Sequence, residues 1–254
     1  MLSQMRILVV ASQKGGCGKT TLAGHLGVEA ERAGHGPVAL IDTDPQGSLA
    51  QWWNEREAET PAFVQSTTQT LRDDLVALRE KGFKLIVIDT PPAATDSISE
   101  IASFADLVVL PTRPSPHDLR SVAVTIDILE ERGKAMVFVL NSATPRARIT
   151  GEAAVALSQH GTVAPVTIHH RVNFASSMID GRTVAEIDED NASAHEIAEL
   201  WSYLADRLER RQVVALPNGV DDVSMPAPRH PVIAETSPAS VTFGRRGRDE
   251  VHSA

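Results

Sequence analysis

The most regular feature of this chain is a series of short, continuous apolar runs that are rich in β-branched residues. Runs of this kind are typical of strands buried on both faces of a parallel sheet, because neither face carries the polar alternation of a half-exposed strand. We therefore expect buried strands at Ile7–Val10, Val38–Ile41, Leu85–Ile88, Leu107–Leu110 and Val137–Leu140.

Between and after these runs, apolar residues return at helical spacing. Positions three and four apart lie on one face of a helix. One such segment carries Leu119, Val122, Ile126 and Leu129, and another carries Ile197, Trp201, Leu204 and Leu208. Strands that alternate with helices predict an α/β fold, in which a doubly wound, mostly parallel sheet is flanked by helices.

The character of the sequence changes at about Gln212. Beyond this residue few large apolar residues remain, and prolines interrupt every potential helix at Pro217, Pro226, Pro228, Pro231 and Pro238. A segment of this composition cannot bury enough apolar surface to fold on its own. We expect one domain over residues 1–211 and a disordered tail over residues 212–254.

Composition narrows the possible functions. The 254 residues carry a formal net charge of −9, which argues against coating with nucleic acid through bulk charge but is compatible with a local basic patch. The single cysteine, Cys17, excludes an internal disulfide and a cysteine-ligated metal cluster. The sequence contains neither a run of about 18 apolar residues nor the core of a signal peptide. We expect a cytoplasmic protein with no membrane partner.

A glycine-rich segment follows the first predicted strand directly. It reads Lys14-Gly15-Gly16-Cys17-Gly18-Lys19-Thr20-Thr21, and a predicted helix at Leu22–Ala33 comes next. Glycines allow backbone N–H groups to converge on phosphate oxygens, and the N-terminus of the following helix favours negative charge at the same place. In such a loop Lys19 reaches the β- and γ-phosphates, and the Thr20 hydroxyl binds Mg²⁺. The segment therefore predicts a site for ATP and Mg²⁺.

Two acidic motifs follow later strands, at the strand ends where ligands of α/β sheets bind. Asp42-Thr43-Asp44-Pro45-Gln46-Gly47-Ser48 comes after the second apolar run, and Asp89 closes the run Leu85–Ile88. Carboxylates beside a triphosphate are suited to hold Mg²⁺ or to orient an attacking water. For the first motif, an Asx-turn that caps a helix over Ser48–Glu57 is the alternative interpretation.

Taken together, these motifs resemble the ParA/MinD superfamily of P-loop NTPases. The usual P-loop pattern fails at its first position, where Gln13 stands in place of glycine, whereas Lys14-Gly15-Gly16-x-Gly18-Lys19-Thr20 resembles the deviant Walker A motif of this superfamily. The acidic segments resemble its D-x-D-P-Q and D-T-P-P switches. The resemblance covers about residues 6–211, and His25 stands where many relatives have asparagine.

The resemblance implies roles for individual residues. Lys14 would cross a dimer interface to the partner's nucleotide, Asp44 would position the attacking water, and Lys14, Lys19 and Asp44 would act in catalysis. The Mg²⁺ site would consist of Thr20, Asp42 and Asp89. The nucleotide would be bound by Lys14, Gly15, Gly16, Cys17, Gly18, Lys19, Thr20 and Thr21, with Pro114 in a proline-bearing loop and Asn141 against adenine.

The resemblance also implies a cycle of assembly. Proteins of this kind form an ATP-dependent homodimer, bind nonspecific DNA at the nucleoid and hydrolyse ATP slowly to ADP and phosphate, and a ParB-like or other cargo adaptor stimulates the hydrolysis. Candidate DNA contacts are the arginines late in an otherwise acidic chain, for which a solvated helix face is the alternative. They are Arg171, Arg182, Arg207, Arg210 and Arg211.

A metabolic ligase or synthetase with the same P-loop fold is the alternative function. Such an enzyme would activate a small molecule with ATP, and its turnover would be independent of DNA. Lys14 favours the positioning ATPase, because a lysine at this place has a role only in a face-to-face dimer. Plasmid, chromosome, microcompartment and receptor cluster all stay open as the cargo.

Overall fold

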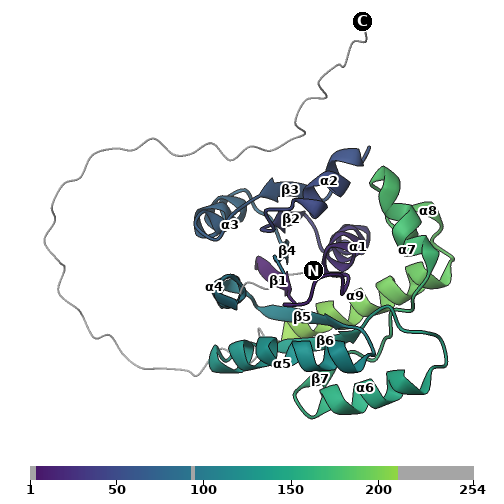
Figure 1. Cartoon of the computed structure of the whole chain (residues 1–254). Helices are drawn as coiled ribbons and strands as arrows, with labels where there is room; N and C mark the ends of the chain where they lie inside the picture. Colours follow the sequence, from purple (N-terminus) through teal and green to yellow (C-terminus); the bar gives the residue numbers. More distant parts are fainter. Residues whose placement is uncertain (1–3, 93–94, 211–254) are drawn as a thin grey trace, which may run out of the picture.

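The computed structural model describes residues 4–92 and 95–210, and within them the strands form one parallel sheet. The strand order is β3-β2-β4-β1-β5-β6-β7, so that β1 lies at the centre (Figure 1). The strands are β1 (Arg6–Val10), β2 (Val38–Asp42), β3 (Ala62–Gln65), β4 (Leu85–Asp89), β5 (Leu107–Thr112), β6 (Met136–Leu140) and β7 (Thr162–Val163). The predicted fold class is confirmed.

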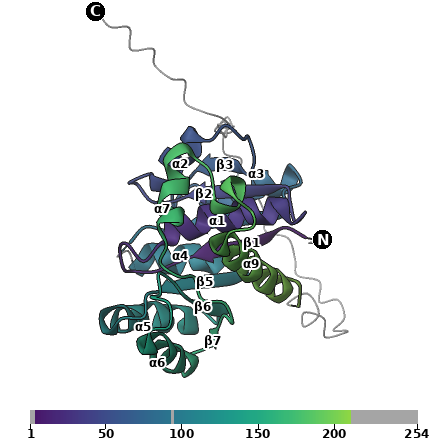
Figure 2. The same cartoon turned by 90° about the vertical axis from the view of Figure 1, so that its right-hand side faces the viewer.

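Helices cover both faces of this sheet (Figures 1 and 2). On one face lie α1 (Lys19–Arg32), α2 (Ser48–Glu55) and α9 (Ala192–Arg210). On the other face lie α3 (Leu71–Glu80), α4 (Thr95–Phe104), α5 (Pro116–Glu131) and α6 (Arg148–Ser158). Three short elements follow one another on the α1 side, namely α7 (Val172–Ser177), η1 (Met178–Asp180) and α8 (Val184–Ile187).

Alternate residues of each strand supply the two halves of the core. In β1, Leu8 and Val10 pack into the cluster beneath α1 and α9, whereas Ile7 and Val9 pack into the cluster beneath α3 to α6. This alternation follows from the two-residue period of a strand. Because both faces are covered, the central strands are continuously apolar between their ends, which is the pattern that predicted them.

The five predicted strands are confirmed, but the sequence did not reveal the two edge strands. In β3 the apolar run is only three residues long, Ala62–Val64, and only Val64 is buried, while β7 has two residues. The helix after the glycine-rich loop starts at Lys19 rather than Leu22, because the left-handed Gly18 starts it directly behind the loop. Within the described ranges, no helix is both long and apolar enough to cross a membrane.

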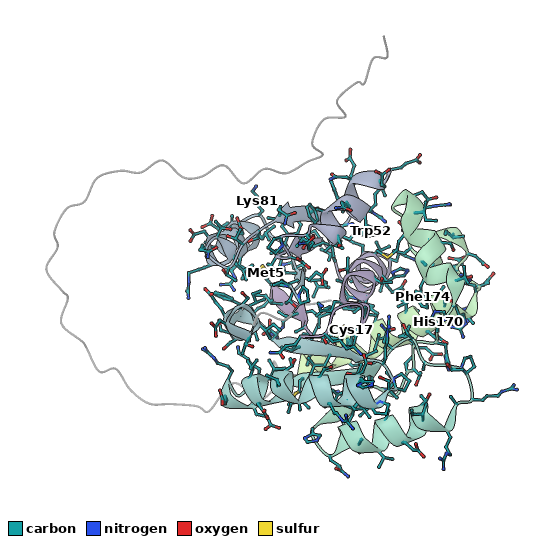
Figure 3. All side chains as sticks on the ribbon, viewed as in Figure 1. Met5, Cys17, Trp52, Lys81, His170 and Phe174 are labelled. Atoms are coloured by element: carbon teal, nitrogen blue, oxygen red, sulfur yellow. The ribbon has the colours of Figure 1, made fainter. Side chains whose placement is uncertain are left out.

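The sheet brings the predicted site residues to one edge. In the strand register Val10 lies beside Asp89, and Asp89 lies beside Asp42, so β1, β2 and β4 end together. Figure 3 marks Trp52 on α2 and Phe174 on α7, the two helices that flank α1 near this edge. The carboxyl ends of parallel strands are where α/β sheets bind ligands.

Candidate functional site

The glycine-rich loop leads from β1 into the N-terminus of α1. Gly16 and Gly18 have φ angles of 73° and 93°, a backbone conformation that side chains disfavour. The first turn of α1 receives no side-chain cap and contains no acidic residue. Its N–H groups and the positive end of its dipole are therefore available to an anion, as the sequence predicted for phosphate.

Thr20 and Asp89 meet beside this loop. The Thr20 hydroxyl donates to Asp89 Oδ2 at 2.6 Å, and Asp89 is only 1% exposed at the end of β4. Asp89 Oδ1 is buried without a hydrogen-bond partner. Mg²⁺ takes hydroxyl and carboxylate oxygens as ligands, so Thr20 and Asp89 fit the ion. The unpartnered Oδ1 of Asp89 is a further oxygen that could coordinate it.

Electrostatics at Asp89 also favour a cation. Burial raises the pKa of Asp89 to about 7, and the Asp42 carboxylate acts in the same direction, while Thr20 and Lys19 oppose it. A bound divalent cation would stabilise the charged carboxylate and reverse this effect. Lys19 is buried, with its ammonium 3.4 Å from the Lys14 carbonyl oxygen.

Asp42 and Asp44 differ in their surroundings. Asp42 is fully buried, and its oxygens accept hydrogen bonds from the N–H groups of Asp44 at 2.9 Å and Ala50 at 3.0 Å. Burial raises the pKa of Asp42, while these bonds act against the shift. Asp44 lines the pocket, half-buried, and its Oδ1 accepts from Gln46 N–H at 2.9 Å. The Asx-turn at Asp44 is therefore present, and it leaves the side chain at the pocket wall.

The ammonium of Lys14 forms an ion pair with the carboxylate of Asp118, in the first turn of α5. Asp118 is 4% exposed, and its other oxygen has no hydrogen-bond partner. Ser115, the N-cap of α5, accepts from Asp118 N–H at 3.1 Å, which fixes the start of this helix. Asp118 was not predicted from the sequence, because its only signal was an acidic residue in a helix's first turn.

Asn141 is hydrogen-bonded to the glycine-rich loop. Its Nδ2 donates to the Cys17 carbonyl at 2.7 Å, and a Cβ at Gly18 would collide with the same amide. Ser142 follows with a φ of 51°, an uncommon conformation for a residue other than glycine. Asn141 lines the pocket, whereas in the proline-bearing loop Arg113 lines it and Pro114 does not.

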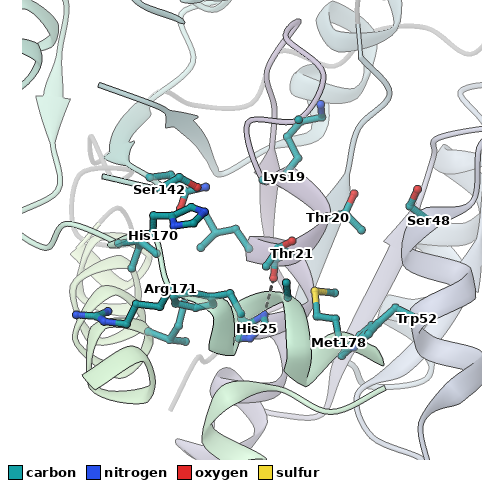
Figure 4. Close-up of a pocket in the computed structure, with 18 of the residues that line it drawn as sticks. Lys19, Thr20, Thr21, His25, Ser48, Trp52, Ser142, His170, Arg171 and Met178 are labelled. Atoms are coloured by element: carbon teal, nitrogen blue, oxygen red, sulfur yellow. Dashed lines mark hydrogen bonds between the residues drawn. The ribbon is translucent and has the colours of Figure 1, made fainter. Parts of the chain in front are cut away.

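A cavity of about 1020 Å³ connects these elements (Figure 4). Its floor is the start of α1 with Lys19 and Thr20, and the segment carrying His170 and Arg171 forms the opposite wall. A third side lies between Trp52 of α2 and the elements α7 and η1. A cavity of this size is large enough for a nucleotide.

The wall opposite α1 is fixed by Glu196 of α9, another residue that the sequence did not single out. His169 Nδ1 lies 2.7 Å from one carboxylate oxygen of Glu196, and Arg171 Nη1 lies 2.6 Å from the other. Burial raises the pKa of Glu196, but the hydrogen bonds from Arg171 and His169 outweigh it and hold the pKa below its ordinary value. This carboxylate therefore holds the segment from His169 to Arg171 in place as a wall of the pocket.

The candidate DNA-binding arginines are dispersed over the described surface. Arg171 pairs with Glu196, and Arg182 pairs with Asp180 at 2.6 Å. Arg207 lies three turns of α9 beyond Glu196, on the order of 16 Å along the axis. Arg210 ends that helix, and Arg211 lies outside the described residues. A common patch would therefore have to extend along α9.

His25 connects α1 to the segment that holds α7 and α8. Its ring is 1% exposed, and Nδ1 lies 2.8 Å from the Thr21 carbonyl oxygen (Figure 4). The other ring nitrogen, Nε2, accepts from Val184 N–H at 3.3 Å. Burial lowers the pKa of His25 to about 4, and the bond to Thr21 only partly opposes this. Only the neutral ring can both donate to Thr21 and accept from Val184.

We expect this buried ring to give stability a defined pH dependence. Its folded pKa of about 4 lies below the ordinary 6.5, so the unfolded chain binds the proton first as the pH falls. Between pH 6.5 and about 4, the free energy of unfolding should fall by about 1 kcal/mol for each unit by which the pH is lowered. Above pH 6.5, His25 should not affect it. In urea titrations His25→Asn should flatten the slope, and His160→Asn, at an exposed ring, should not. Equal slopes in wild type and His25→Asn would contradict the assignment.

Comparison with known proteins agrees with this geometry. Residues 8–216 match the family described as the CobQ/CobB/MinD/ParA nucleotide binding domain. The chain belongs to this family. Its curated relatives include a carboxysome-distribution protein, a ParA protein and the chromosome-partitioning ATPase Soj, and they match the chain over different lengths.

Two of these relatives show the range of the similarity. Maintenance of carboxysome distribution protein A of Halothiobacillus neapolitanus is 29% identical over 196 residues, 74% of this chain and 90% of the relative. Protein ParA of Rhizobium radiobacter is 32% identical over 133 residues, which are 52% of this chain and 60% of the relative.

Solved structures of the ParA/MinD family share the fold. An ATP complex of a substituted McdA from Cyanothece superposes with a TM-score of 0.65 at 20% identity, covering 82% of this chain and 97% of that one. MinD of Pyrococcus horikoshii with Mg-ADP gives a TM-score of 0.66 at 16% identity, and the match covers 79% of this chain and 96% of MinD. This chain therefore has the fold of these ParA/MinD structures.

Proposed function

We propose that this protein is a cytoplasmic, nucleoid-associated positioning ATPase that dimerises around Mg-ATP, binds DNA without sequence preference and is released when an adaptor stimulates hydrolysis. The observation that carries the proposal concerns Lys14. This lysine belongs to the phosphate loop, yet it does not line the cavity of its own chain, and its ammonium lies on Asp118. A lysine held beside its own pocket is suited to reach the nucleotide of a second copy.

Each residue of the site has a role in this proposal. The N–H groups of the loop and Lys19 bind the phosphates, and Thr20 with Asp89 holds the metal. Mg²⁺, when bound, neutralises charge on the phosphate oxygens. Asp42, the third residue predicted for the Mg²⁺ site, also holds the Asp44 turn and the start of α2 through its two oxygens. Asp44 orients the attacking water from the pocket wall.

The cavity also provides a place for the base. Asn141 and Ser142, which follow β6, line the cavity beside His170 and Arg171, because the two segments are bridged at Ala143 and His169. The brace from Asn141 to Cys17 ties this region to the phosphate loop, so that base and phosphates are bound by one connected unit. We assign adenine to the part of the cavity that Asn141, Ser142, His170 and Arg171 line.

The relatives support a positioning function over the metabolic alternative. Among them are proteins named for chromosome partitioning, probable plasmid partitioning and maintenance of carboxysome distribution, and the last of these matches over 90% of its own length. The adaptor is a ParB-like protein or another cargo protein, whose encounter with the ATP dimer stimulates hydrolysis. ATP turnover that requires a small-molecule substrate and ignores DNA would favour the ligase instead.

DNA binding should depend on ATP and on α9. Replacing Arg207 and Arg210 together with glutamine should weaken binding of the ATP form several-fold and reduce the salt slope by about one for each arginine that touches a phosphate. Arg79→Gln, at an exposed arginine of α3 on the other face of the sheet, is the matched control and should change neither value. Gel shifts across a salt series measure both. Equal affinity with ADP and ATP would sink the DNA part of the proposal.

A further inference from the structure

The helix α2 is anchored in the nucleotide site at its first end. Asp42, at the end of β2, accepts from Asp44 N–H with one oxygen and from Ala50 N–H, in the first turn of α2, with the other. One buried carboxylate therefore holds both the Asp44 turn and the start of the helix. A displacement of α2 would be transmitted directly to Asp44.

The other end of α2 is held by Arg56. This arginine is 2% exposed and ends the helix in an extended conformation. Its Nη1 donates to the Gly181 carbonyl at 2.6 Å, and its two terminal nitrogens lie 3.0 and 2.8 Å from the carboxylate oxygens of Glu186. The guanidinium also donates to the Thr60 carbonyl at 2.8 Å. Such a paired fork has one geometry, so it fixes the helix end in place.

Backbone contact reinforces this junction. A Cβ at Gly181 would lie 2.6 Å from Arg56 Cα and closer still to the backbone nitrogen of Arg56. Only glycine therefore allows these two segments of the backbone to approach each other. Gly181 also has a φ of 75°. Trp52 of α2 adds a bond from its indole N–H to the Arg182 carbonyl at 3.2 Å. The far end of α2 therefore rests on residues 181–186.

The same segment rests on the phosphate-binding helix. Glu186 accepts from Thr183 N–H at 2.8 Å in the capping box of α8, and Val184 N–H in the first turn of α8 donates to His25 of α1. The His25 ring is in turn bonded to Thr21, next to the metal-binding Thr20. Residues 181–186 thus bridge α1, which carries the phosphate site, and α2, whose start is shared with Asp44.

We infer that Arg56 is a positioning residue for ATP hydrolysis, which sets the place of Asp44 relative to the phosphates by fixing α2 on residues 181–186. The inference rests on the proposed function, because it assigns the reaction to Asp44. Arg56 does not touch the nucleotide site. It acts through a helix of eight residues, about 12 Å long, held at both ends. Small misplacements of a group that orients a reactant cost large factors in rate.

Two variants test the inference. Arg56→Lys keeps the charge but cannot form the fork, and Gly181→Ala forces the two backbones apart. We expect both to bind Mg-ATP within about threefold of wild type and to slow single-turnover hydrolysis on the order of tenfold or more. Hydrogen exchange of the N–H groups of Asp44 and Gln46 should rise in both, a readout that does not require ATPase activity. Glu186→Gln, the mildest change, should slow hydrolysis several-fold.

Matched controls separate positioning from general destabilisation. Gly34→Ala introduces a side chain at a φ of 77° with nothing within 4 Å, so it has the strain of Gly181→Ala without the collision. Arg32→Gln removes a surface ion pair to Glu189 on the same side of the molecule. Both should leave hydrolysis and the exchange of Asp44 and Gln46 unchanged.

Four outcomes are informative. Slowed hydrolysis with intact binding and faster exchange at Asp44 supports the inference. Folded Arg56→Lys and Gly181→Ala proteins with wild-type hydrolysis and wild-type exchange would overturn it, as would equal losses in binding and hydrolysis that follow the fraction unfolded. A wild-type protein that does not hydrolyse ATP would contradict the proposed function, and the exchange measurement would then decide separately whether Arg56 positions the Asp44 turn.

Discussion

Asp44→Ala should bind ATP and dimerise but hydrolyse ATP about 100-fold more slowly than wild type. Asp44 lines the cavity with its carboxylate bonded to Gln46 N–H, apart from the Thr20–Asp89 pair, so its loss leaves the phosphate and metal groups in place. Phosphoryl transfer depends mainly on positioning, and the loss of the group that orients water falls on the chemical step. Single-turnover hydrolysis and the lifetime of the ATP dimer are the measurements.

Asp44→Asn is the control that separates the two roles of this residue. Asparagine can still accept the hydrogen bond from Gln46 N–H, so it retains the Asx-turn and removes only the charge. If the charge orients water, the asparagine variant should be as slow as the alanine variant. Wild-type hydrolysis by Asp44→Ala, with DNA and adaptor present, would reduce Asp44 to a turn residue.

Lys14→Gln should prevent the ATP-dependent dimerisation of the protein while sparing the binding of ATP to the monomer. Loss of one partner of a desolvated charge pair across an interface costs about 2–5 kcal/mol, so the dimer should weaken at least about 30-fold. The monomer should be less affected, because Lys14 does not line its own cavity. Light scattering with a nonhydrolysable ATP analogue measures the assembly.

Two further variants bracket this result. Asp118→Asn weakens the hold on Lys14 within its own chain, so the dimer should form at several-fold lower ATP concentration. Lys19→Ala should fail earlier, at nucleotide binding, because it removes a direct phosphate contact. A Lys14→Gln protein that dimerises like wild type, or a wild type that stays monomeric with ATP, would exclude Lys14 from acting across an interface.

Local sequence was sufficient for those parts of the site that lie within one continuous segment. The glycine-rich loop combines a strand, left-handed glycines and a helix start, and Asp89 directly ends an apolar run, so both could be placed from their neighbours. The predicted roles of these residues stay predictions, while the strands that present them are confirmed. The edge strand β3 was missed because a half-exposed strand of four residues offers an apolar run too short to distinguish it from a loop.

Contacts between distant segments could not be found in this way. Lys14 and Asp118 are 104 residues apart, Asn141 and Cys17 124, and Arg56 and Glu186 130. Polar residues in such pairs have no periodicity, and each is compatible with a solvated surface until the chain folds. His25 is an example, since only the folded chain shows that its ring joins α1 to Val184.

The sequence by itself determined the α/β architecture and the phosphate loop, because hydrophobic periodicity and glycine conformation act over neighbouring residues. Only the tertiary structure decided where Lys14 is held, which groups occupy the oxygens of Asp42, and how Arg56 ties α2 to Gly181. Those arrangements follow from the parallel register, which brings strand ends and helix ends from distant parts of the chain to one edge of the sheet, where buried charges must find partners.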